Sequence, residues 1–305
     1  AAAPAAAEAA AATASAAVTA ARLASADRQT REIGDASSRS ATHHRTADSE
    51  ASARRHCAIL RQPRNFAARQ LTLATRARSH TMPKKILILN TSAASFAGGE
   101  TGVWLEECAA PYYIFVEAGL EVSMATPAGG PTPIDKGSMG EGFFTDACKK
   151  FLHDQEAMSL FMHTKKLSEV DLAAFDALYL SGGHGCCTDF AANADVKAAI
   201  ETMYASKLVA ADCHGPIALA QCAKPDGTPL VAGLEVTGFS DVEEGQVGQT
   251  GNVPFLIESK FKELGASYVC GEPWTSKTAA AGKLLTGQNP QSSEALAALV
   301  VKTLA

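Results

Sequence analysis

The residue with the clearest chemical potential is Cys213, which lies in the segment 208–220, LVAADCHGPIALA. The apolar residues before it predict a buried strand, and Gly215 and Pro216 after it predict a sharp turn into a helix. A thiol at such a turn lies near the positive end of a helix dipole, which favours the thiolate. The segment therefore predicts a cysteine nucleophile, with the amide of His214 as an oxyanion donor. A buried thiol that only packs is the alternative.

A second segment of interest is the turn of Gly182, Gly183, His184 and Gly185, which follows an apolar run. A structural turn is the ordinary explanation for such glycines, and the functional one is a backbone amide offered to a developing oxyanion. Glu107 lies near the start of a predicted helix, where most glutamates belong to a solvated face. These groups can act together only if the fold brings them to the cysteine.

His214 is a possible base for the thiol, but it directly follows Cys213 in the chain. We therefore expect its side chain to point away from the sulfur. A histidine base also needs a carboxylate to orient it, and the segment 237–244, TGFSDVEE, offers three. These are Asp241, Glu243 and Glu244, and the pattern leaves the choice among them open.

The strands expected to position these groups are short apolar runs bounded by turn residues. They cover residues 84–91, 121–126, 176–180 and 208–212, with further strands at 235–239 and 267–270. Helices are expected at 103–118, 193–206, about 253–264 and 291–303, and a helical excursion over one edge at 134–170. Pro111 predicts a kink or a break in the first helix.

This alternation predicts an α/β fold with a doubly wound, mainly parallel, flavodoxin-like sheet and helices on both faces. In such folds ligands bind at the carboxyl ends of the strands. The loops after residues 91, 181, 212 and 239 are all expected at that edge.

Composition divides the chain near Met82. Residues 1–81 contain 12 Arg, no Lys and six acidic residues, whereas residues 82–305 contain 15 Lys, no Arg and 26 acidic residues, so the net charges are +6 and −11. The first part is rich in Ala and Ser and has too few large apolar side chains to offset its ordering entropy. It predicts a disordered leader, either a transit peptide to the chloroplast or mitochondrion or a translated stretch upstream of a cytoplasmic protein that starts at Met82.

The composition of residues 82–305 excludes several classes of function. An acidic domain without arginine is a poor nucleic-acid binder, and no run reaches the roughly 18 apolar residues of a membrane span. The seven cysteines there are odd in number and lack Cys-x-x-Cys spacing, which argues against disulfides and structural zinc. His153 and His163 form no ligand motif, so no metal is expected. The pair Cys186 and Cys187 is either two packed thiols or a redox-sensitive rim.

Four motifs, taken in order, resemble those of one protein family. They are TGVWLEE followed by Pro111, SGGHG, ADCHGP and TGFSDVEE, and GEPW and LLTGQNP near the carboxyl terminus add to the pattern. The chain is similar in them to the PfpI-type, class I glutamine amidotransferase-like superfamily. Within it, the chain resembles the heat-shock-type glutathione-independent glyoxalases (glyoxalase III, D-lactate dehydratase). The resemblance covers residues 84–305 and nothing of 1–81, so a PfpI-like domain is expected over 82–305.

The resemblance implies a role for each matching residue. Cys213 would be the nucleophile, His214 its triad partner and Glu244 the triad acid. Glu107 matches the carboxylate that contacts the reactive cysteine, while its neighbour Glu106 is expected to face elsewhere.

The amides of Gly183 and His214 match an oxyanion hole, and His184 is a possible substrate contact. No cofactor is implied, and the family resemblance favours a homodimer.

The activity implied is that of a lyase that converts methylglyoxal, a 2-oxoaldehyde, to D-lactate and protects against carbonyl and oxidative stress. The thiolate adds to the aldehyde to give a hemithioacetal, and a base moves a proton to the neighbouring carbon through an enediolate. His214 and Glu107 are both candidates for that base. A holdase chaperone and a protein deglycase are the alternatives. A cysteine peptidase or amidotransferase is less favoured, because in amidotransferases the histidine comes from a distant loop.

Overall fold

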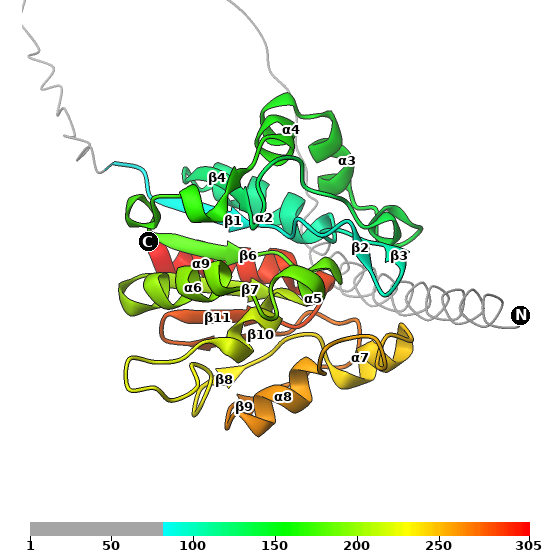
Figure 1. The fold of residues 1–305 in the computed structure, drawn as a ribbon. Helices are drawn as coiled ribbons and strands as arrows, with labels where there is room; N and C mark the ends of the chain where they lie inside the picture. Colours follow the sequence, from blue (N-terminus) through cyan, green and yellow to red (C-terminus); the bar gives the residue numbers. More distant parts are fainter. Residues whose placement is uncertain (1–81) are drawn as a thin grey trace, which may run out of the picture. The chain divides into compact units, whose positions relative to one another are not determined.

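A seven-stranded sheet forms the centre of residues 82–305, the part that the structure, a computed structural model, describes (Figure 1). Its strands are β1 (Lys85–Leu89), β4 (Glu121–Thr126), β5 (Lys165–Lys166), β6 (Ala177–Leu180), β7 (Leu208–Asp212), β10 (Thr278–Ala281) and β11 (Leu284–Gly287). Their order across the sheet is β10-β11-β7-β6-β1-β4-β5, and all neighbours are parallel except β10 and β11. The five strands β4-β1-β6-β7-β11 therefore have the order 2-1-3-4-5, which is that of flavodoxin-like sheets and confirms the predicted fold class.

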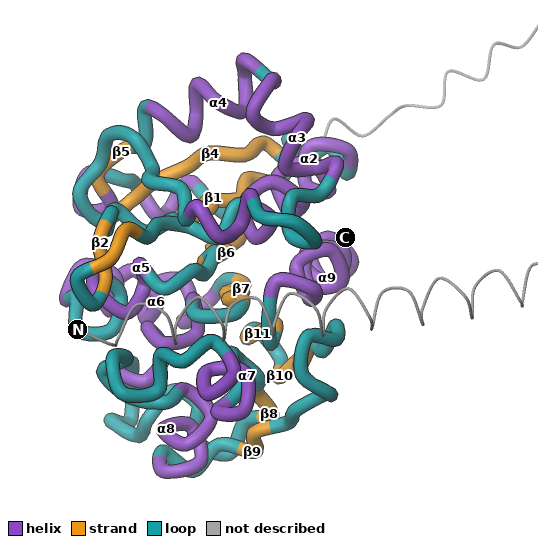
Figure 2. Tube along the Cα trace, turned by 90° about the vertical axis from the view of Figure 1, so that its right-hand side faces the viewer, coloured by secondary structure: helices purple, strands orange, loops and turns teal. Residues whose placement is uncertain are grey.

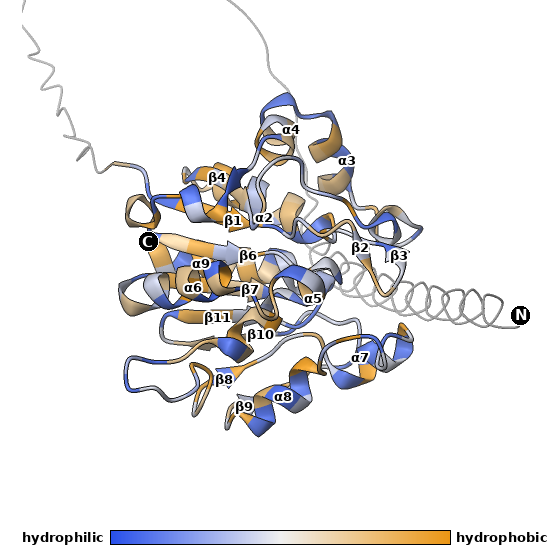
Figure 3. Cartoon of the chain, viewed as in Figure 1, coloured by the Kyte–Doolittle hydropathy of each residue, from blue (hydrophilic) through white to orange (hydrophobic). Residues whose placement is uncertain are grey.

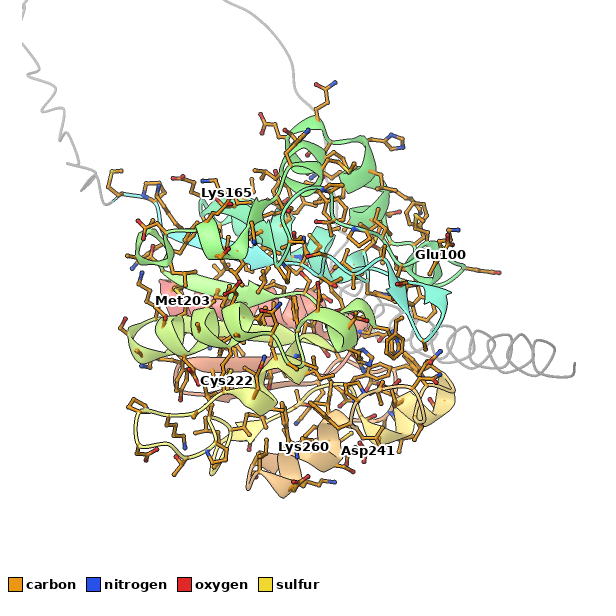
Figure 4. The ribbon with its side chains drawn as sticks, in the orientation of Figure 1. Glu100, Lys165, Met203, Cys222, Asp241 and Lys260 are labelled. Atoms are coloured by element: carbon orange, nitrogen blue, oxygen red, sulfur yellow. The ribbon has the colours of Figure 1, made fainter. Side chains whose placement is uncertain are left out.

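Helices cover both faces of this sheet (Figure 2). They are α2 (Glu106–Glu117), α3 (Asp146–His153), α4 (Gln155–Met162) and α9 (Ser293–Leu304) on one face, and α5 (Gly185–Asp189) and α6 (Ala194–Ser206) on the other. Ile86 and Ile88 of β1 belong to the core under the first set, while Leu87 and Leu89 belong to the core that includes Met203 of α6 (Figure 4). A strand buried on both faces explains why β1 is apolar throughout.

The remaining elements lie at the margins of the sheet. They are the hairpin β2 (Ser95–Phe96) and β3 (Gly99–Glu100), the parallel pair β8 (Glu235–Val236) and β9 (Ser267–Tyr268), α7 (Asp241–Gln246) and α8 (Ile257–Glu263). Short 3-10 helices cover Lys136–Met139, Leu167–Glu169, Leu172–Ala174, Gly215–Gln221 and Pro290–Ser292. Figure 3 shows α7 and α8 with mixed polar and apolar residues, whereas β11 is mostly apolar. No helix of residues 82–305 combines the length and apolar character that crossing a bilayer requires.

Two parts of the predicted sheet are wrong. The strands expected at 235–239 and 267–270 are present only as β8 and β9, which pair with each other outside the central sheet. The three strands that complete the sheet, β5, β10 and β11, have no counterpart among the predicted strands, and β5 lies in the segment 134–170 that was expected to be helical. β10 has the sequence Thr-Ala-Ala-Ala, whose weak strand propensity is overridden by pairing with β11, and β11 in turn pairs with β7.

Two local helix predictions also need correction. The helix α2 runs without a break through Pro111, which costs one hydrogen bond, to the carbonyl of Glu107 near the helix start. The segment after Cys213 forms the 3-10 helix Gly215–Gln221 rather than an α-helix. The predicted leader falls on residues 1–81, which lie outside the described residues.

Candidate active site

The predicted nucleophile, Cys213, lies in a strained turn at the carboxyl end of β7. Its φ of +55° is in the left-handed region, which residues other than glycine seldom adopt and which is common at functional sites. Two backbone hydrogen bonds hold the turn: the N–H of Cys213 donates to the carbonyl of Gly287 at 3.1 Å, and that of Phe239 donates to the carbonyl of Cys213 at 2.9 Å. The thiol residue is only 3% exposed. The sharp turn predicted from the sequence is therefore present.

His214 faces the sulfur, so the prediction that it points away is wrong. Its Nδ1 lies 3.4 Å from Sγ of Cys213, and its Nε2 lies 2.8 Å from Oε2 of Glu244. Neighbouring side chains alternate in a strand, but the left-handed backbone of Cys213 reverses the chain and turns both side chains to one side. The three side chains form a Cys-His-Glu line of the kind that activates a nucleophile.

Of the three acidic residues left open by the sequence, Glu244 is the one that reaches His214. It lies in α7, whose first turn is fixed by a capping box between Ser240 and Glu243. Asp241 faces α8 instead, where it accepts a hydrogen bond from Ser259 (Figure 4). The cap thus orients the helix so that Glu244 points at the histidine.

Glu243 is a buried anchor for the loops around the site. Besides the cap, its carboxylate accepts hydrogen bonds from the N–H of Trp274 at 2.8 Å, the amide of Gln288 at 3.0 Å and the amide of Asn289 at 2.8 Å. Trp274 also has a positive φ of +59°. Glu243 therefore fixes the position of α7 rather than contacting the thiol.

His184 shares the carboxylate of Glu244. Its Nε2 lies 2.9 Å from Oε1, and its ring centroid lies 4.1 Å from that of His214. The side chain is 16% exposed, and it stacks on Phe96 of β2. A substrate contact by His184 stays a prediction, but its position beside the triad was not foreseen from the sequence.

The protonation states of Glu244 and His214 follow from the groups that surround them. Burial alone would raise the pKa of Glu244, but the charges and hydrogen bonds of His214 and His184 outweigh it and lower that pKa to about 2. Burial lowers the pKa of His214, and the neighbouring His184 lowers it further. At neutral pH Glu244 is thus ionised and His214 neutral. With Nε2–H donating to Glu244, Nδ1 is left as an acceptor toward the thiol.

Glu107 is a second carboxyl group at the sulfur. Its Oε2 accepts a hydrogen bond from the N–H of Gly182 at 2.7 Å, while Oε1 has no hydrogen-bond partner among residues 82–305. Burial and then the negative charge of Asp212 raise the pKa of Glu107 well above its ordinary value, and interactions with Cys213 and Gly182 only partly offset this. These surroundings therefore favour the protonated form of Glu107. Its neighbour Glu106 accepts hydrogen bonds from Thr145 and Cys148.

The surroundings of Cys213 favour the thiol over the thiolate that the sequence predicts, and the thiolate stays a prediction. Burial raises the pKa of Cys213 well above its usual value, and a negative charge on Glu107 or Asp212, where present, raises it further. Only a 3-10 turn follows the cysteine, so the dipole of an α-helix is missing. The proton must therefore leave the sulfur during the reaction, and His214 Nδ1 is placed to accept it.

The predicted oxyanion donors lie in adjacent loops. A side chain at Gly182 would bring its Cβ within 2.7 Å of the His214 nitrogen and 2.5 Å of Oε2 of Glu107, so only glycine fits there. Gly183 has a φ of +100°. Neither the amide of Gly183 nor that of His214 donates to another group within residues 82–305, which leaves both available to a substrate oxygen.

Asp212 is the residue of this site that sequence reasoning missed. It ends β7, is wholly buried, and precedes the cysteine directly. An aspartate at the end of an otherwise apolar strand is the signal that could identify it, because a carboxylate is rarely buried unless it has a partner.

Other cysteines and histidines lie apart from this chemistry. Cys186 and Cys187 are buried, and burial raises the pKa of both thiols, which favours the packing explanation over a redox-sensitive rim. His163 contacts the carbonyl of Ser159.

His184, His214 and Glu244 lie close enough together to hold a metal ion, with ligand atoms within 4.8 Å of one another. Their facing atoms, however, already form two hydrogen bonds, and we treat the three as a hydrogen-bonded group.

Comparisons with known proteins place the chain in one family. Residues 99–303 match the DJ-1/PfpI family. Among curated proteins, glyoxalase 3 of Candida albicans is 31% identical over 70% of this chain and 94% of its own length. The glutathione-independent glyoxalase HSP31 of Saccharomyces cerevisiae is 30% identical over 73% and 98%. A protein/nucleic acid deglycase HchA of Pseudomonas aeruginosa is 28% identical over 72% and 81%. The crystal structure of glyoxalase III from Candida albicans superposes with a TM-score of 0.67 at 30% identity, covering 72% of this chain and 97% of that one.

Proposed function

Because the chain belongs to the DJ-1/PfpI family, we propose that it is a glutathione-independent glyoxalase, a lyase that converts methylglyoxal to D-lactate without a cofactor. The observation that carries the proposal is the position of His214, whose Nδ1 lies 3.4 Å from the Cys213 sulfur while Nε2 contacts Glu244. The names of the relatives that share this fold indicate which substrate such a thiol attacks.

The first step is addition of the thiol to the aldehyde. The proton of Cys213 passes to Nδ1 of His214 as a bond forms between Sγ and the aldehyde carbon, and it is then returned to the aldehyde oxygen. Glu244 stabilises the transient imidazolium. The product is a neutral hemithioacetal, and His214 is again free to act as a base.

The second step moves a proton between the two carbons. His214, neutral at physiological pH, removes the proton from the former aldehyde carbon, and the amides of Gly183 and His214 stabilise the enediolate. Protonation of the neighbouring carbon, with a proton passing between the two oxygens, gives a thioester. Glu107 keeps its proton in this scheme and acts as a hydrogen-bond donor to the sulfur or the enediolate.

Hydrolysis completes the cycle. Water attacks the thioester, the bond between carbon and Sγ breaks, and the sulfur takes back a proton as D-lactate leaves. No step requires an electron acceptor or a metal. The residues at the site are sufficient to donate and accept each proton.

The test is D-lactate formation from methylglyoxal by the full chain without glutathione. We expect turnover by the wild type and none by Cys213→Ala, whose matched control is Cys222→Ala, a buried cysteine that no step uses. Absence of turnover in the wild type, with suppression of client aggregation retained in Cys213→Ala, would instead support a holdase chaperone.

A second candidate function, protein deglycase, is favoured by the similarity to the HchA deglycase. It uses the same thiol and an early adduct of the same kind. The comparison of turnover numbers on free methylglyoxal and on a methylglyoxal-modified peptide separates the two. Faster turnover on the peptide would favour the deglycase.

The remaining expectations stay predictions. They are a homodimer, a catalytic domain over residues 82–305, and a leader that directs the protein to the chloroplast or mitochondrion. If the leader has no such function, a cytoplasmic protein that starts at Met82 is expected.

A further inference from the structure

Aromatic rings pack against both histidines of the site. The ring of Phe96 stacks on that of His184 with 5.5 Å between the centroids, and the ring of Phe239 lies 4.4 Å from that of His214. The two imidazoles lie 4.1 Å apart, so the four rings form one continuous series of contacts. Apolar ring surface therefore adjoins the histidine that faces the Cys213 sulfur.

The series of rings continues from Phe239 and returns to the reactive centre. Trp274 contacts Phe239 edge to face, with 5.7 Å between the ring centroids, and Phe143 contacts Trp274 in the same way at 6.4 Å. Trp104 contacts Phe143 at 5.0 Å. A Cβ at Gly183 would lie 2.6 Å from the backbone nitrogen of Trp104, so this last residue adjoins a predicted oxyanion donor. We call these side chains the aromatic belt; its members are Phe96, Phe239, Trp274, Phe143 and Trp104.

Core packing accounts for only part of the aromatic belt. Phe239 is buried, but the other four members are partly exposed. Within residues 82–305, Trp104 and Phe143 belong to neither of the two hydrophobic cores. The belt is built from four parts of the chain, at residues 96–104, 143, 239 and 274. Partly exposed rings that gather from separate segments beside a reactive group are typical of a surface that holds an apolar ligand.

Trp274 has a fixed position in the belt. Its backbone N–H donates to Oε1 of Glu243 at 2.8 Å, and its indole N–H donates to Oε1 of Gln246 at 2.6 Å. Its φ of +59° is a conformation that a bulky side chain seldom adopts and that persists where the surroundings enforce it. Both of its N–H groups are thus engaged, and the indole is preorganised to contact an apolar group.

We propose that the aromatic belt binds the substituent of the substrate, and that the site prefers 2-oxoaldehydes with an aromatic substituent, such as phenylglyoxal, to methylglyoxal. Trp274 is then a specificity-determining residue. A phenyl ring exposes far more apolar surface than a methyl group, and it can contact the edges and faces of neighbouring rings. The proposal rests on the proposed glyoxalase function, because it concerns the same thiol and the same proton transfer.

The chemistry of phenylglyoxal at this site would be that of methylglyoxal. Sγ of Cys213 bonds to the aldehyde carbon, a proton is removed from that carbon and one is added to the neighbouring carbon, and water cleaves the thioester to release mandelate. Phenylglyoxal and one water together have the composition of mandelic acid, so no oxidant or reductant is needed. The phenyl group keeps its bond to the former ketone carbon throughout, and only its contacts with the belt differ from those of a methyl group.

The first test compares kcat/KM of the full chain for phenylglyoxal and for methylglyoxal. We expect a ratio of about 10 or more in favour of phenylglyoxal, since a single methylene in an apolar site already changes kcat/KM by about tenfold. In Trp274→Leu the ratio should fall by about tenfold, because the largest ring of the belt is lost. The fraction of folded protein cancels from this ratio, and if Trp274→Leu does not fold, Phe143→Leu should lower the ratio in the same direction.

The matched control is Phe161→Leu, whose buried ring contacts Phe151 of α3 instead of the belt. Its ratio should equal that of the wild type. Phenylglyoxal also modifies arginine, and all arginines of the chain lie in residues 1–81, so initial rates are measured with enzyme added last. Equal losses of the ratio in Trp274→Leu and Phe161→Leu would overturn the role of Trp274.

The second test does not depend on turnover. In 2-hydroxyacetophenone and hydroxyacetone an alcohol replaces the aldehyde of the two substrates, so neither compound forms the adduct with Cys213, and calorimetry gives their dissociation constants. We expect the wild type to bind the aromatic compound at least about tenfold more tightly, and Trp274→Leu to lose this difference.

The two tests separate this proposal from the proposed function. Turnover of methylglyoxal with no preference for the aromatic compound in either test would overturn the aromatic preference and leave the glyoxalase function intact. Tighter binding of 2-hydroxyacetophenone by a chain that turns over neither aldehyde would support the aromatic preference of the site and reject the glyoxalase function. Faster turnover of a methylglyoxal-modified peptide than of phenylglyoxal would assign the belt to a peptide and overturn the proposal.

Discussion

Two buried glutamates face Cys213, and their surroundings shift their pKa values in opposite directions. Glu244 lies between the imidazoles of His214 and His184, at 2.8 and 2.9 Å, and they lower its pKa to about 2 despite its burial. Glu107 is buried beside another carboxyl, Asp212, and its pKa is raised. The surroundings of Glu244 therefore favour its ionised form, and those of Glu107 favour its protonated form.

The neighbouring groups, rather than residue type or burial, therefore decide whether each carboxyl favours its ionised or its protonated form. Both side chains are almost fully removed from water, where the neutral form is the default. Two proton donors reverse that default at Glu244, whereas a like charge reinforces it at Glu107. Similar pairs of carboxyls with diverging pKa values are a recurring way to obtain an acid and an anion in one site.

Removing the negative charge of Glu244 should have the largest effect on kcat. In Glu244→Gln, the amide no longer fixes the tautomer of His214 or stabilises its imidazolium, so we expect kcat to fall by about 10³- to 10⁴-fold. Steady-state kinetics with methylglyoxal measures this. Asp241→Asn is the matched control, since Asp241 is in the same helix but faces α8, and it should stay near wild-type activity. Equal losses in the two variants would contradict the role of Glu244.

Replacing the carboxyl of Glu107 should lower kcat by a smaller factor. In Glu107→Gln the amide can still donate a hydrogen bond toward the sulfur, so we expect kcat to fall by about 10- to 100-fold. Glu107→Ala removes the donor and should be less active still. If Glu107 were the base that moves the proton, glutamine and alanine would be equally inactive, and measuring kcat for both variants separates the two roles.

The contributions of Glu244 and Asp212 to stability should change with pH in opposite directions. The folded pKa of Glu244 lies below its ordinary value of 4.5, so its ionised form contributes stability above that pH and loses it as the pH falls toward about 2. The contribution is roughly 3 kcal/mol at neutral pH, from the linkage of about 1.4 kcal/mol per pKa unit. Glu244→Gln should therefore destabilise the protein strongly at neutral pH, progressively less below about pH 4.5, and little only at or below about pH 2.

Asp212 should show the reverse trend. Its folded pKa of about 7 exceeds the ordinary 3.8, so the folded state binds the extra proton and loses stability as the pH rises between those values. Asp212→Asn removes that loss, and its free energy of unfolding relative to wild type should increase from about pH 4 to about pH 8. Urea denaturation of both variants across this range checks the comparison, and parallel trends would contradict it.

Chelation should have the smallest effect. Because the facing atoms of His184, His214 and Glu244 pair with one another, we expect activity to be unchanged after treatment with a strong chelator. The control is metal analysis of the protein before and after treatment. Loss of activity that added zinc restores would show that these three residues bind a metal.

The sequence predicts those features that depend on local patterns. Apolar runs identify β1, β4, β6 and β7, and the glycine and proline after Cys213 identify its sharp turn. The resemblance then singles out Glu244 and Glu107, which the structure brings to His214 and to the sulfur.

The sequence does not predict features that depend on contacts distant along the chain. The strands β10 and β11 form because β7 offers an edge for pairing. The orientation of His214 follows from the positive φ of Cys213, which no residue pattern encodes. The hydrogen-bond partners of the buried Asp212 come from α9 and β6, which are distant from it in the sequence.

The most direct test of the contrast between the two carboxyls is infrared difference spectroscopy of the full chain at neutral pH. We compare wild type with Glu107→Gln and with Glu244→Gln, and follow the carbonyl band of a protonated carboxyl. We expect Glu107→Gln to lose this band and Glu244→Gln to lose only carboxylate absorption. A protonated band that disappears in Glu244→Gln and persists in Glu107→Gln would contradict it.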